Sequence, residues 1–160
     1  MTTATLASET TVIAVGTPAP EIVLQDQDKK EFKLSSFKGK NVVLFWYPLD
    51  WSPTCTKENA CFTNDYSRFS KYAEVAAISI DSTWSHKAWQ EKMGLKHRLL
   101  SDMHRAATKA YGVYLPAANI SQRATVIVDK NGIVAYAKVE ADITKERDYS
   151  AIEEALKKLA

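Results

Sequence analysis

The run Asn41-Val-Val-Leu-Phe-Trp-Tyr47, which Pro48 ends, decides the fold of this chain. It is a continuous series of β-branched and aromatic residues, and such a series is typical of a strand that is buried on both faces of a sheet. From Thr54 to about Tyr72, the apolar residues take a helical spacing instead. A buried strand followed by a helix begins an α/β domain, and we expect this strand in the middle of its sheet.

The remaining segments predict strands and helices in an order that is typical of a mixed sheet. The expected elements are a hairpin of Ile22–Leu24 with Glu31–Leu34, a buried strand Glu74–Ile80, a helix from Ser82 or Thr83 to about Lys92, a short helix Met103–Tyr111, a hairpin of Arg123–Val128 with Ile133–Ala137, and a last helix after Asp148. Asn131-Gly132 suits a type I′ turn in the second hairpin, because that turn needs two positive φ angles. The sequence therefore predicts an α/β domain of three layers, with an N-terminal β-hairpin and a central mixed β-sheet flanked by helices.

Length and composition narrow the class of protein. With 160 residues, 46% of them hydrophobic, the chain suffices for one well-packed domain but not comfortably for two. The 21 basic and 19 acidic residues are dispersed, so no nucleic-acid-binding surface is indicated. No stretch reaches the roughly 18 to 20 apolar residues that cross a bilayer. We therefore expect neither nucleic acid nor a membrane as a partner.

Residues 1–14 are expected to be a loose, flexible extension, and residues 15–160 a single domain. The extension lacks the basic and apolar regions of a secretory signal, so we expect cytoplasmic localisation, with a short targeting role as the alternative. In a reducing cytoplasm, two cysteines are more typical of a reactive, metal-binding or inert role than of a structural disulfide. They form no Cys-x-x-Cys pair, and His86, His97 and His104 have no ligand spacing and are expected at the surface. Neither a metal nor another cofactor is expected.

Cys55 is the candidate reactive residue, because it stands where the buried strand gives way to a helix. In open α/β folds, ligands bind at this carboxyl edge of the sheet. In a first helical turn, unpaired backbone N–H groups and the helix dipole stabilise a thiolate, which is the nucleophilic form of cysteine. The alternative is an ordinary buried cysteine.

A thiolate nucleophile also needs donors that hold the substrate and stabilise the leaving atom. Ser52, three residues before the cysteine, can supply a hydroxyl, although a serine before a helix is as often a cap. Arg123, at the start of a later strand, can supply a permanent charge, although its position alone favours a surface residue. Pro48 and Pro53 can stiffen the loop and, with Trp51, shield the thiolate from water.

The segment from Pro48 to Glu58 resembles the active-site signature of the peroxiredoxin family. That signature is a proline, three residues, a Thr or Ser, two residues and the peroxidatic cysteine, here Pro48, Ser52 and Cys55. The next residues, Thr56-Lys-Glu58, are similar to the Cys-Thr-Lys-Glu run of the bacterioferritin-comigratory (Q-type), alkyl hydroperoxide reductase-like branch. The likeness spans Val15 to Leu159 and includes Lys38-Gly-Lys40, Ile78-Ser-Ile-Asp81, Leu99-Leu-Ser-Asp102, Ala110-Tyr-Gly-Val113, and Arg123-Ala-Thr125 with Asp129-Lys-Asn-Gly132.

The resemblance implies a thioredoxin-like fold and a thiol-dependent peroxidase without a cofactor. In that family the cysteine attacks hydrogen peroxide or an organic hydroperoxide, giving a sulfenic acid and water or an alcohol, and thioredoxin or another thiol restores it. By resemblance, Cys55 is peroxidatic, Ser52 hydrogen-bonds the peroxide, and Arg123 activates both thiolate and peroxide. Glu58 then orients the arginine, whereas from the residues alone its charge merely suits the helix dipole. Monomer and homodimer both stay open.

Cys61 departs from the family pattern. A resolving cysteine on this helix usually follows the peroxidatic one by five residues, and here the offset is six. On an intact helix six residues rise about 9 Å, beyond the roughly 4.4 to 6.8 Å between Cα atoms that a disulfide tolerates. A Cys55–Cys61 disulfide therefore requires the first turns of the helix to unwind. We expect Cys61 to resolve the sulfenic acid, with direct reduction by an external thiol as the alternative.

Two other functions compete with the peroxidase. One is a redox sensor that passes oxidation from Cys55 to a partner protein, and the other is a non-catalytic thioredoxin-like scaffold. Steady turnover with a reducing system favours the enzyme, a stalled mixed disulfide with another protein favours the sensor, and unreactive Cys55 favours the scaffold.

Overall fold

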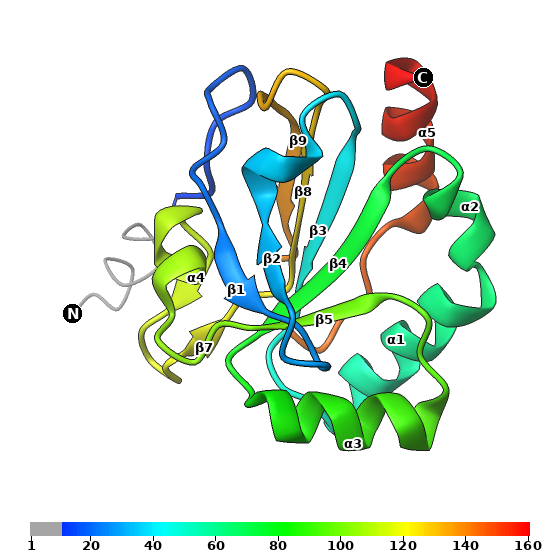
Figure 1. Ribbon diagram of the computed structural model, residues 1–160. Helices are drawn as coiled ribbons and strands as arrows, with labels where there is room; N and C mark the ends of the chain where they lie inside the picture. Colours follow the sequence, from blue (N-terminus) through cyan, green and yellow to red (C-terminus); the bar gives the residue numbers. More distant parts are fainter. Residues whose placement is uncertain (1–10) are drawn as a thin grey trace.

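The fold is a mixed β-sheet with helices on both faces (Figure 1). The structure is a computed structural model that describes residues 11–160, apart from the side chains of Cys61 and Phe62. In this part of the chain the strands of the main sheet are Val23–Gln25 (β1), Glu31–Lys33 (β2), Val42–Trp46 (β3), Glu74–Ser79 (β4), Arg98–Ser101 (β5), Ala124–Val128 (β8) and Val134–Val139 (β9). Their order is β2-β1-β5-β4-β3-β8-β9, and Tyr114–Leu115 (β6) pairs separately with Ile120–Ser121 (β7).

Strand β3 lies in the interior of the sheet, as its sequence predicts. It pairs in parallel with β4 and antiparallel with β8 along its whole length, and all of its residues are buried. Because side chains alternate along a strand, Val42, Leu44 and Trp46 join the core on one face, whereas Val43 and Phe45 join the core on the other. Because both faces of β3 are buried, every position of the strand is occupied by an apolar residue.

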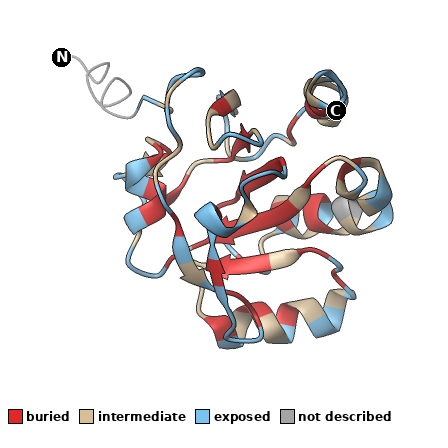
Figure 2. Cartoon of the chain, turned by 45° about the horizontal axis from the view of Figure 1, so that its top comes forward, coloured by how far each residue is buried: buried red, intermediate tan, exposed pale blue. Residues whose placement is uncertain are grey.

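The helices complete two outer layers. They are Pro53–Asn64 (α1), Tyr66–Ser70 (α2), Thr83–Met93 (α3), Ala106–Ala110 (α4) and Tyr149–Leu159 (α5), with a 3₁₀ helix at Leu34–Phe37. One core includes residues of α1, α2, α3 and α5, and the other lies under α4 and the β1–β2 hairpin. Figure 2 shows buried residues along the central strands and exposed residues on the outer sides of the helices. The predicted α/β class, with a central mixed sheet between two outer layers, is confirmed. No helix in residues 11–160 is long and apolar enough to cross a bilayer.

Several predicted helix boundaries are confirmed by their caps. The Ser82 hydroxyl accepts the Ser85 backbone N–H at the start of α3, and Gly94 ends that helix in the left-handed region at a φ of 65°. The Asp148 carboxylate accepts the Ala151 N–H at the start of α5. These signals are local, which is why the sequence alone places them correctly.

The predicted helix from Thr54 to Tyr72 is wrong in one respect, because it is two helices that separate at Asp65. The segment contains neither Pro nor Gly. The break instead accompanies tertiary packing: Phe69 is buried on the sheet and meets the Phe45 ring edge-on, with centroids 6.1 Å apart. The helix expected over Met103–Tyr111 is also shorter, since α4 covers Ala106–Ala110 only.

The turn between β8 and β9 is not the predicted type I′ turn. Gly132 has a φ of 78°, whereas Asn131 is not among the described residues with a positive φ. The Gly132 N–H donates to the Asp129 carbonyl, and the Asp129 carboxylate accepts the N–H groups of Asn131 and Ile133 at 2.8 and 3.0 Å. A carboxylate that binds two backbone donors selects a different turn from the one that Asn-Gly favours by itself.

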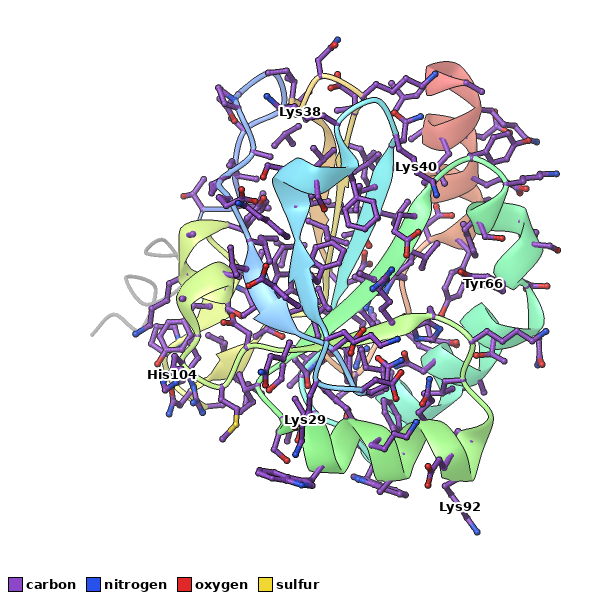
Figure 3. The ribbon with its side chains drawn as sticks, in the orientation of Figure 1. Lys29, Lys38, Lys40, Tyr66, Lys92 and His104 are labelled. Atoms are coloured by element: carbon purple, nitrogen blue, oxygen red, sulfur yellow. The ribbon has the colours of Figure 1, made fainter. Side chains whose placement is uncertain are left out.

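Two of the three histidines contradict the expected surface position. His86 and His97 are buried, whereas His104 is exposed beside α4 (Figure 3). The buried rings are held by polar partners, since His86 Nε2 lies 3.0 Å from the Leu100 carbonyl and His97 Nε2 lies 2.7 Å from Asn59 Oδ1. The lysines labelled in Figure 3 lie in different parts of the molecule, in keeping with a dispersed charge.

Contacts with the core begin before Val15. Residues 1–10 of the predicted extension lie outside the described residues, but the Ile13 N–H donates to the Tyr111 carbonyl at 3.0 Å, and Val12 and Ile13 pack against the core. Gly112, at a φ of 70°, passes so close that a Cβ atom there would lie 1.9 Å from the Thr11 carbonyl oxygen. Only glycine fits at this crossing.

Candidate active site

Cys55 lies in the first turn of α1, immediately after the loop that leaves β3. Pro53 is the first helical residue, and the Ser52 carbonyl accepts the Thr56 N–H at 2.8 Å, so the helix starts one residue before the predicted Thr54. In the loop before the helix, the backbone of Trp51 is in the left-handed region, with a φ of 71°. Cys55 is 0% exposed. The thiol therefore sits at the positive end of a helix, sealed from solvent.

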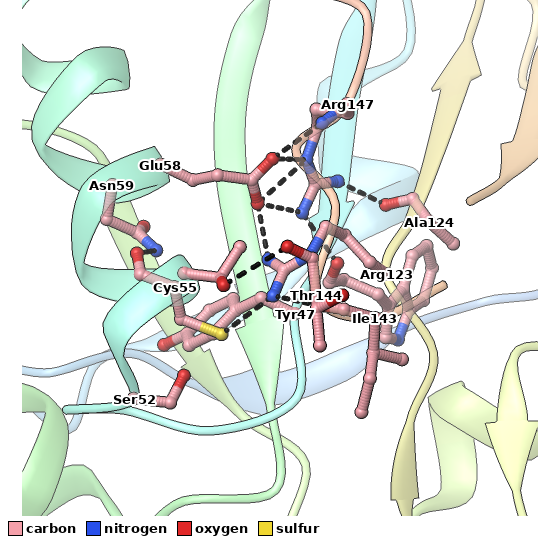
Figure 4. A network of polar contacts seen from close by, with 12 residues as sticks. Tyr47, Ser52, Cys55, Glu58, Asn59, Arg123, Ala124, Ile143, Thr144 and Arg147 are labelled. Carbon is pink, nitrogen blue, oxygen red and sulfur yellow. Dashed lines mark hydrogen bonds and ion pairs between the residues drawn. The ribbon is translucent and has the colours of Figure 1, made fainter. Parts of the chain in front are cut away.

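The guanidinium of Arg123 contacts the Cys55 sulfur (Figure 4). Its Nη2 atom lies 3.2 Å from Cys55 Sγ, and Nε and Nη2 also donate to the Ile143 carbonyl at 3.1 and 2.9 Å. The residue is 1% exposed and precedes β8 directly. Burial works against its charge, but the charges of Glu58 and Cys55 raise the pKa of Arg123 above its ordinary value. The predicted partnership of cysteine and arginine is therefore present in the geometry.

Glu58 is the carboxylate that holds this arginine. It is 0% exposed, one turn after Cys55, and forms ion pairs with Arg123 Nη1 and with Arg147. Burial acts to raise the pKa of Glu58, but the charges of Arg147 and Arg123 outweigh it and hold that pKa below the usual range. Glu58 therefore lies where it can orient Arg123, and the role that the family resemblance implies for it stays a prediction.

Arg147 is a site residue that the sequence did not reveal. Its backbone N–H donates to Glu58 Oε2 at 2.8 Å, and its guanidinium donates to the Ala124 carbonyl at 2.5 Å and the Trp46 carbonyl at 2.8 Å. It is buried between the ends of β3 and β8. Arg147 stands in an irregular segment, just before the Asp148 cap of α5, where no periodicity or motif marks it.

The segment between β9 and α5 binds α1 at three points. The contacts are Thr54 Oγ1 with the Thr144 carbonyl at 3.3 Å, Lys57 Nζ with Glu146 Oε2 at 3.1 Å, and Glu58 with Arg147. The same segment supplies the Ile143 carbonyl to Arg123. The site is thus assembled from α1, the start of β8 and this segment, which lie far apart in the sequence.

Ser52 and Pro48 lie in the loop beside Cys55. The Ser52 hydroxyl donates to the Leu49 carbonyl at 3.2 Å, and the side chain is next to the cysteine in Figure 4. Pro48 is buried at the end of β3. Cys61 belongs to α1, but its side chain lies outside the described residues, so its predicted resolving role stays a prediction.

A buried polar network holds the loop between β3 and α1 in place. The Tyr47 hydroxyl donates to Asp50 Oδ1 at 2.6 Å, His86 Nδ1 lies 2.8 Å from Asp50 Oδ2, and the Asp50 N–H donates to Asp81 Oδ2 at 2.8 Å. Burial first, and then the Asp50 charge, raise the pKa of Tyr47 well above its ordinary value. Tyr47 is therefore a neutral hydrogen-bond donor. The sequence did not indicate this network, because its members lie after β3, after β4 and in α3, far apart in the chain.

Asn59 and His97 form a second buried pair, behind Cys55. Asn59 Nδ2 donates to the Cys55 carbonyl at 2.8 Å, and Asn59 Oδ1 lies 2.7 Å from His97 Nε2. Both residues are 1% exposed. Burial and the nearby Arg147 charge lower the pKa of His97 to about 4, so the ring is neutral at pH 7. Because Asn59 Oδ1 can only accept a hydrogen bond, the ring proton is assigned to Nε2.

The lowered pKa of His97 predicts a loss of stability in acid. The unfolded chain takes up the proton near pH 6.5, whereas the folded chain does so only near pH 4, so stability falls as the pH drops through this window. Between pH 7 and pH 5 the His97 contribution should amount to about 2 kcal/mol of unfolding free energy. Urea unfolding of the wild type and of His97→Gln at both pH values measures it. Equal losses in the two proteins would contradict the assignment.

In residues 11–160, outside the undescribed side chains, no group of three or more His, Cys, Asp or Glu side chains is arranged to hold a metal ion. The chemistry that this geometry supports belongs to one sulfur, one guanidinium and the carboxylate that holds the guanidinium. A cysteine sulfur beside a fixed cation is a candidate nucleophile, with N–H donors in place for negative charge that develops next to it.

Comparison with known proteins agrees with this geometry. The model of the AhpC/TSA family matches residues 15–137. A protein of Synechocystis sp., whose name places it among the peroxiredoxins, is 40% identical over 141 residues that cover 81% of this chain and 70% of its own. The chloroplastic peroxiredoxin Q of Oryza sativa subsp. japonica is 41% identical over 128 residues, 78% of this chain and 58% of that one.

A solved structure extends the agreement to the whole fold. The crystal structure of a peroxiredoxin-like protein from Aquifex aeolicus superposes with a TM-score of 0.87 at 26% identity, over 95% of this chain and 91% of that one. The family match covers the Cys55, Glu58 and Arg123 positions that the structure brings together. By sequence and by fold, this chain belongs to the AhpC/TSA family, in its peroxiredoxin Q branch.

Proposed function

We propose that the protein is a thiol-dependent peroxidase that reduces hydrogen peroxide and organic hydroperoxides with Cys55. The contact that carries this proposal is Arg123 Nη2 at 3.2 Å from Cys55 Sγ, with Glu58 fixing the guanidinium. It places a permanent positive charge where a thiolate forms and where the leaving oxygen gains negative charge. Because the chain spans only 58% of the rice relative, the activity rests on the site rather than on the relatives' names.

The first half-reaction follows from these positions. The Cys55 thiolate attacks the nearer peroxide oxygen, a sulfur–oxygen bond forms, and the O–O bond breaks. The displaced oxygen leaves as hydroxide or alkoxide and takes up a proton to give water or an alcohol. Arg123 donates hydrogen bonds throughout. Ser52, beside Cys55, is placed to exchange its bond with the Leu49 carbonyl for one with the bound peroxide.

The second half-reaction returns Cys55 to the thiol. A thiol attacks the sulfenic sulfur, a disulfide forms and water leaves, and a dithiol such as thioredoxin then reduces the disulfide. A dithiol reductant suits a reducing compartment, and the cytoplasm is our proposal for it.

The proposal is tested by intact mass after one equivalent of hydrogen peroxide. Wild-type protein should gain one oxygen or lose two hydrogens, Cys55→Ser should do neither, and the wild type should then turn over steadily with a thioredoxin system. An unmodified wild type would refute the peroxidase. A single oxidation that ends in a mixed disulfide with another protein would instead support a redox relay.

Cys61→Ser separates the two routes of reduction. If Cys61 resolves the sulfenic acid, the wild type should form an intramolecular disulfide and the variant should keep the added oxygen on Cys55 until a thiol is supplied. Peptide mapping by mass spectrometry distinguishes the two products. Identical products from both proteins would show that an external thiol reduces Cys55 directly.

A further inference from the structure

We propose that the Asn59–His97 pair holds the first turns of α1 closed and thereby sets how fast a second thiol reaches Cys55 after oxidation. This inference rests on the proposed peroxidase, but it concerns a different step. In this scheme the peroxide, a small molecule, reacts before α1 opens, whereas the second thiol needs the site to open. Asn59 and His97 are therefore positioning residues rather than catalytic ones.

The closed site excludes a second thiol. Cys55 is 0% exposed, and Arg123 occupies one side of its sulfur at 3.2 Å. Thiol–disulfide chemistry requires the attacking sulfur to approach along the bond that it breaks, so access limits the rate. Either an external thiol or Cys61 must therefore wait until the first turns of α1 move.

The Asn59–His97 pair restrains that movement directly. Asn59 Nδ2 donates to the carbonyl of Cys55 itself, at 2.8 Å, and so ties the cysteine backbone to the next turn of α1. Asn59 Oδ1 is in turn held by His97 Nε2 at 2.7 Å, and His97 stands outside α1, immediately before β5. The chain of contacts therefore runs from the reactive residue to the sheet.

The orientation of the Asn59 amide is determined by its two partners. The Cys55 carbonyl can only accept, so the amide nitrogen must face it and the amide oxygen must face His97. This arrangement requires a proton on His97 Nε2, and the lowered pKa of His97 keeps the ring neutral at neutral pH. Opening the helix breaks two hydrogen bonds in a place where water does not reach them.

A second contact between the same two segments provides a matched control. The Lys96 N–H donates to Thr63 Oγ1 at 3.2 Å. Thr63 lies two turns after Cys55 on α1, and Lys96 is the neighbour of His97. Removing this bond weakens the contact between α1 and the segment before β5 without releasing the first turns of the helix.

The test separates the two half-reactions in a Cys61→Ser background. One equivalent of hydrogen peroxide oxidises Cys55, and excess dithiothreitol then reduces it: the S–O bond breaks, an S–S bond forms and water leaves. Quenched-flow mass spectrometry follows the loss of the added oxygen. Asn59→Ala should accelerate this loss about three- to tenfold, because it removes both hydrogen bonds. Its oxidation by peroxide should not accelerate.

Thr63→Val should reduce at the parent rate. Hydrogen exchange should be faster in Asn59→Ala at the amides of residues 56–59, and Thr63→Val should show no such change. His97→Leu should act like Asn59→Ala, whereas His97→Gln keeps an N–H donor and should act like the parent. This histidine series gives the same answer if Asn59→Ala does not fold.

Different failures have different meanings. If Asn59→Ala and His97→Leu reduce at the parent rate, or if Thr63→Val accelerates as much as they do, the inference is overturned while the peroxidase stands. A purely structural role would slow oxidation and leave reduction unchanged, which also overturns it. If the parent gains no oxygen from peroxide, the proposed peroxidase fails first and the inference fails with it.

Discussion

Arg123→Ala should slow the oxidation of Cys55 by hydrogen peroxide by about 10²- to 10³-fold, the range expected when a fixed donor to a developing negative charge is removed. Arg123 Nη2 is the described cation in contact with Cys55 Sγ, and it is buried. The loss should therefore fall on the rate of the first half-reaction. Stopped-flow tryptophan fluorescence, with intact mass at each time point, measures it.

Arg98→Ala is the control for this prediction. Arg98 is a partly exposed arginine on β5 that pairs with Glu74 at 2.9 Å and does not contact the cysteine. Its removal should leave the oxidation rate unchanged. Arg123→Lys keeps the charge but not the planar set of N–H donors, so an intermediate rate is expected. A rate for Arg123→Ala within a few-fold of wild type would contradict the mechanism.

Glu58→Gln should lower the free energy of unfolding by about 3 kcal/mol or more, because it leaves two buried guanidinium groups without their carboxylate. Glu58 is 0% exposed and pairs with both Arg123 and Arg147. The side chains have nearly the same shape, so the loss reports the charge rather than packing. Urea unfolding measures it, and the oxidation rate of Cys55 should fall as well, since Arg123 loses the partner that orients it.

Glu153→Gln is the matched control on the surface. Glu153 pairs with Arg68 at 2.9 Å, also between a helix and a distant arginine, but in contact with solvent. Its replacement should change stability far less, because water screens exposed ion pairs. Equal destabilisation by the two substitutions would show that burial of the Glu58 charges does not matter.

The sequence predicts this fold well where its signals are local. The apolar run of β3 and the caps at Ser82 and Asp148 each depend on a few neighbouring residues, and the structure confirms all three. Cys55 belongs to the same class, because its place at a strand-to-helix junction can be read from the chain. The type I′ turn at Asn131 fails for the complementary reason: the Asp129 carboxylate, outside the dipeptide, decides the turn.

The rest of the site depends on contacts between distant segments. Arg147 meets Glu58 across 89 positions, and His97 meets Asn59 across 38, so no local pattern marks either of them. From its sequence position Arg123 is expected on the surface of a strand, whereas in the fold it is buried. Glu58 was placed only through the family resemblance. Buried polar residues of this kind can be identified only from the residues to which they hydrogen-bond, and the sequence does not show which residues those are.

The three contacts between α1 and the segment before α5 link the chemistry at one sulfur to the C-terminal end of the chain. When the first turns of α1 move, these three contacts are lost, and α5 begins two residues after Arg147. A reporter group on α5 should therefore signal the redox state of Cys55 from a distance. The last helix would then report the state of the active site, although it supplies none of the catalytic residues.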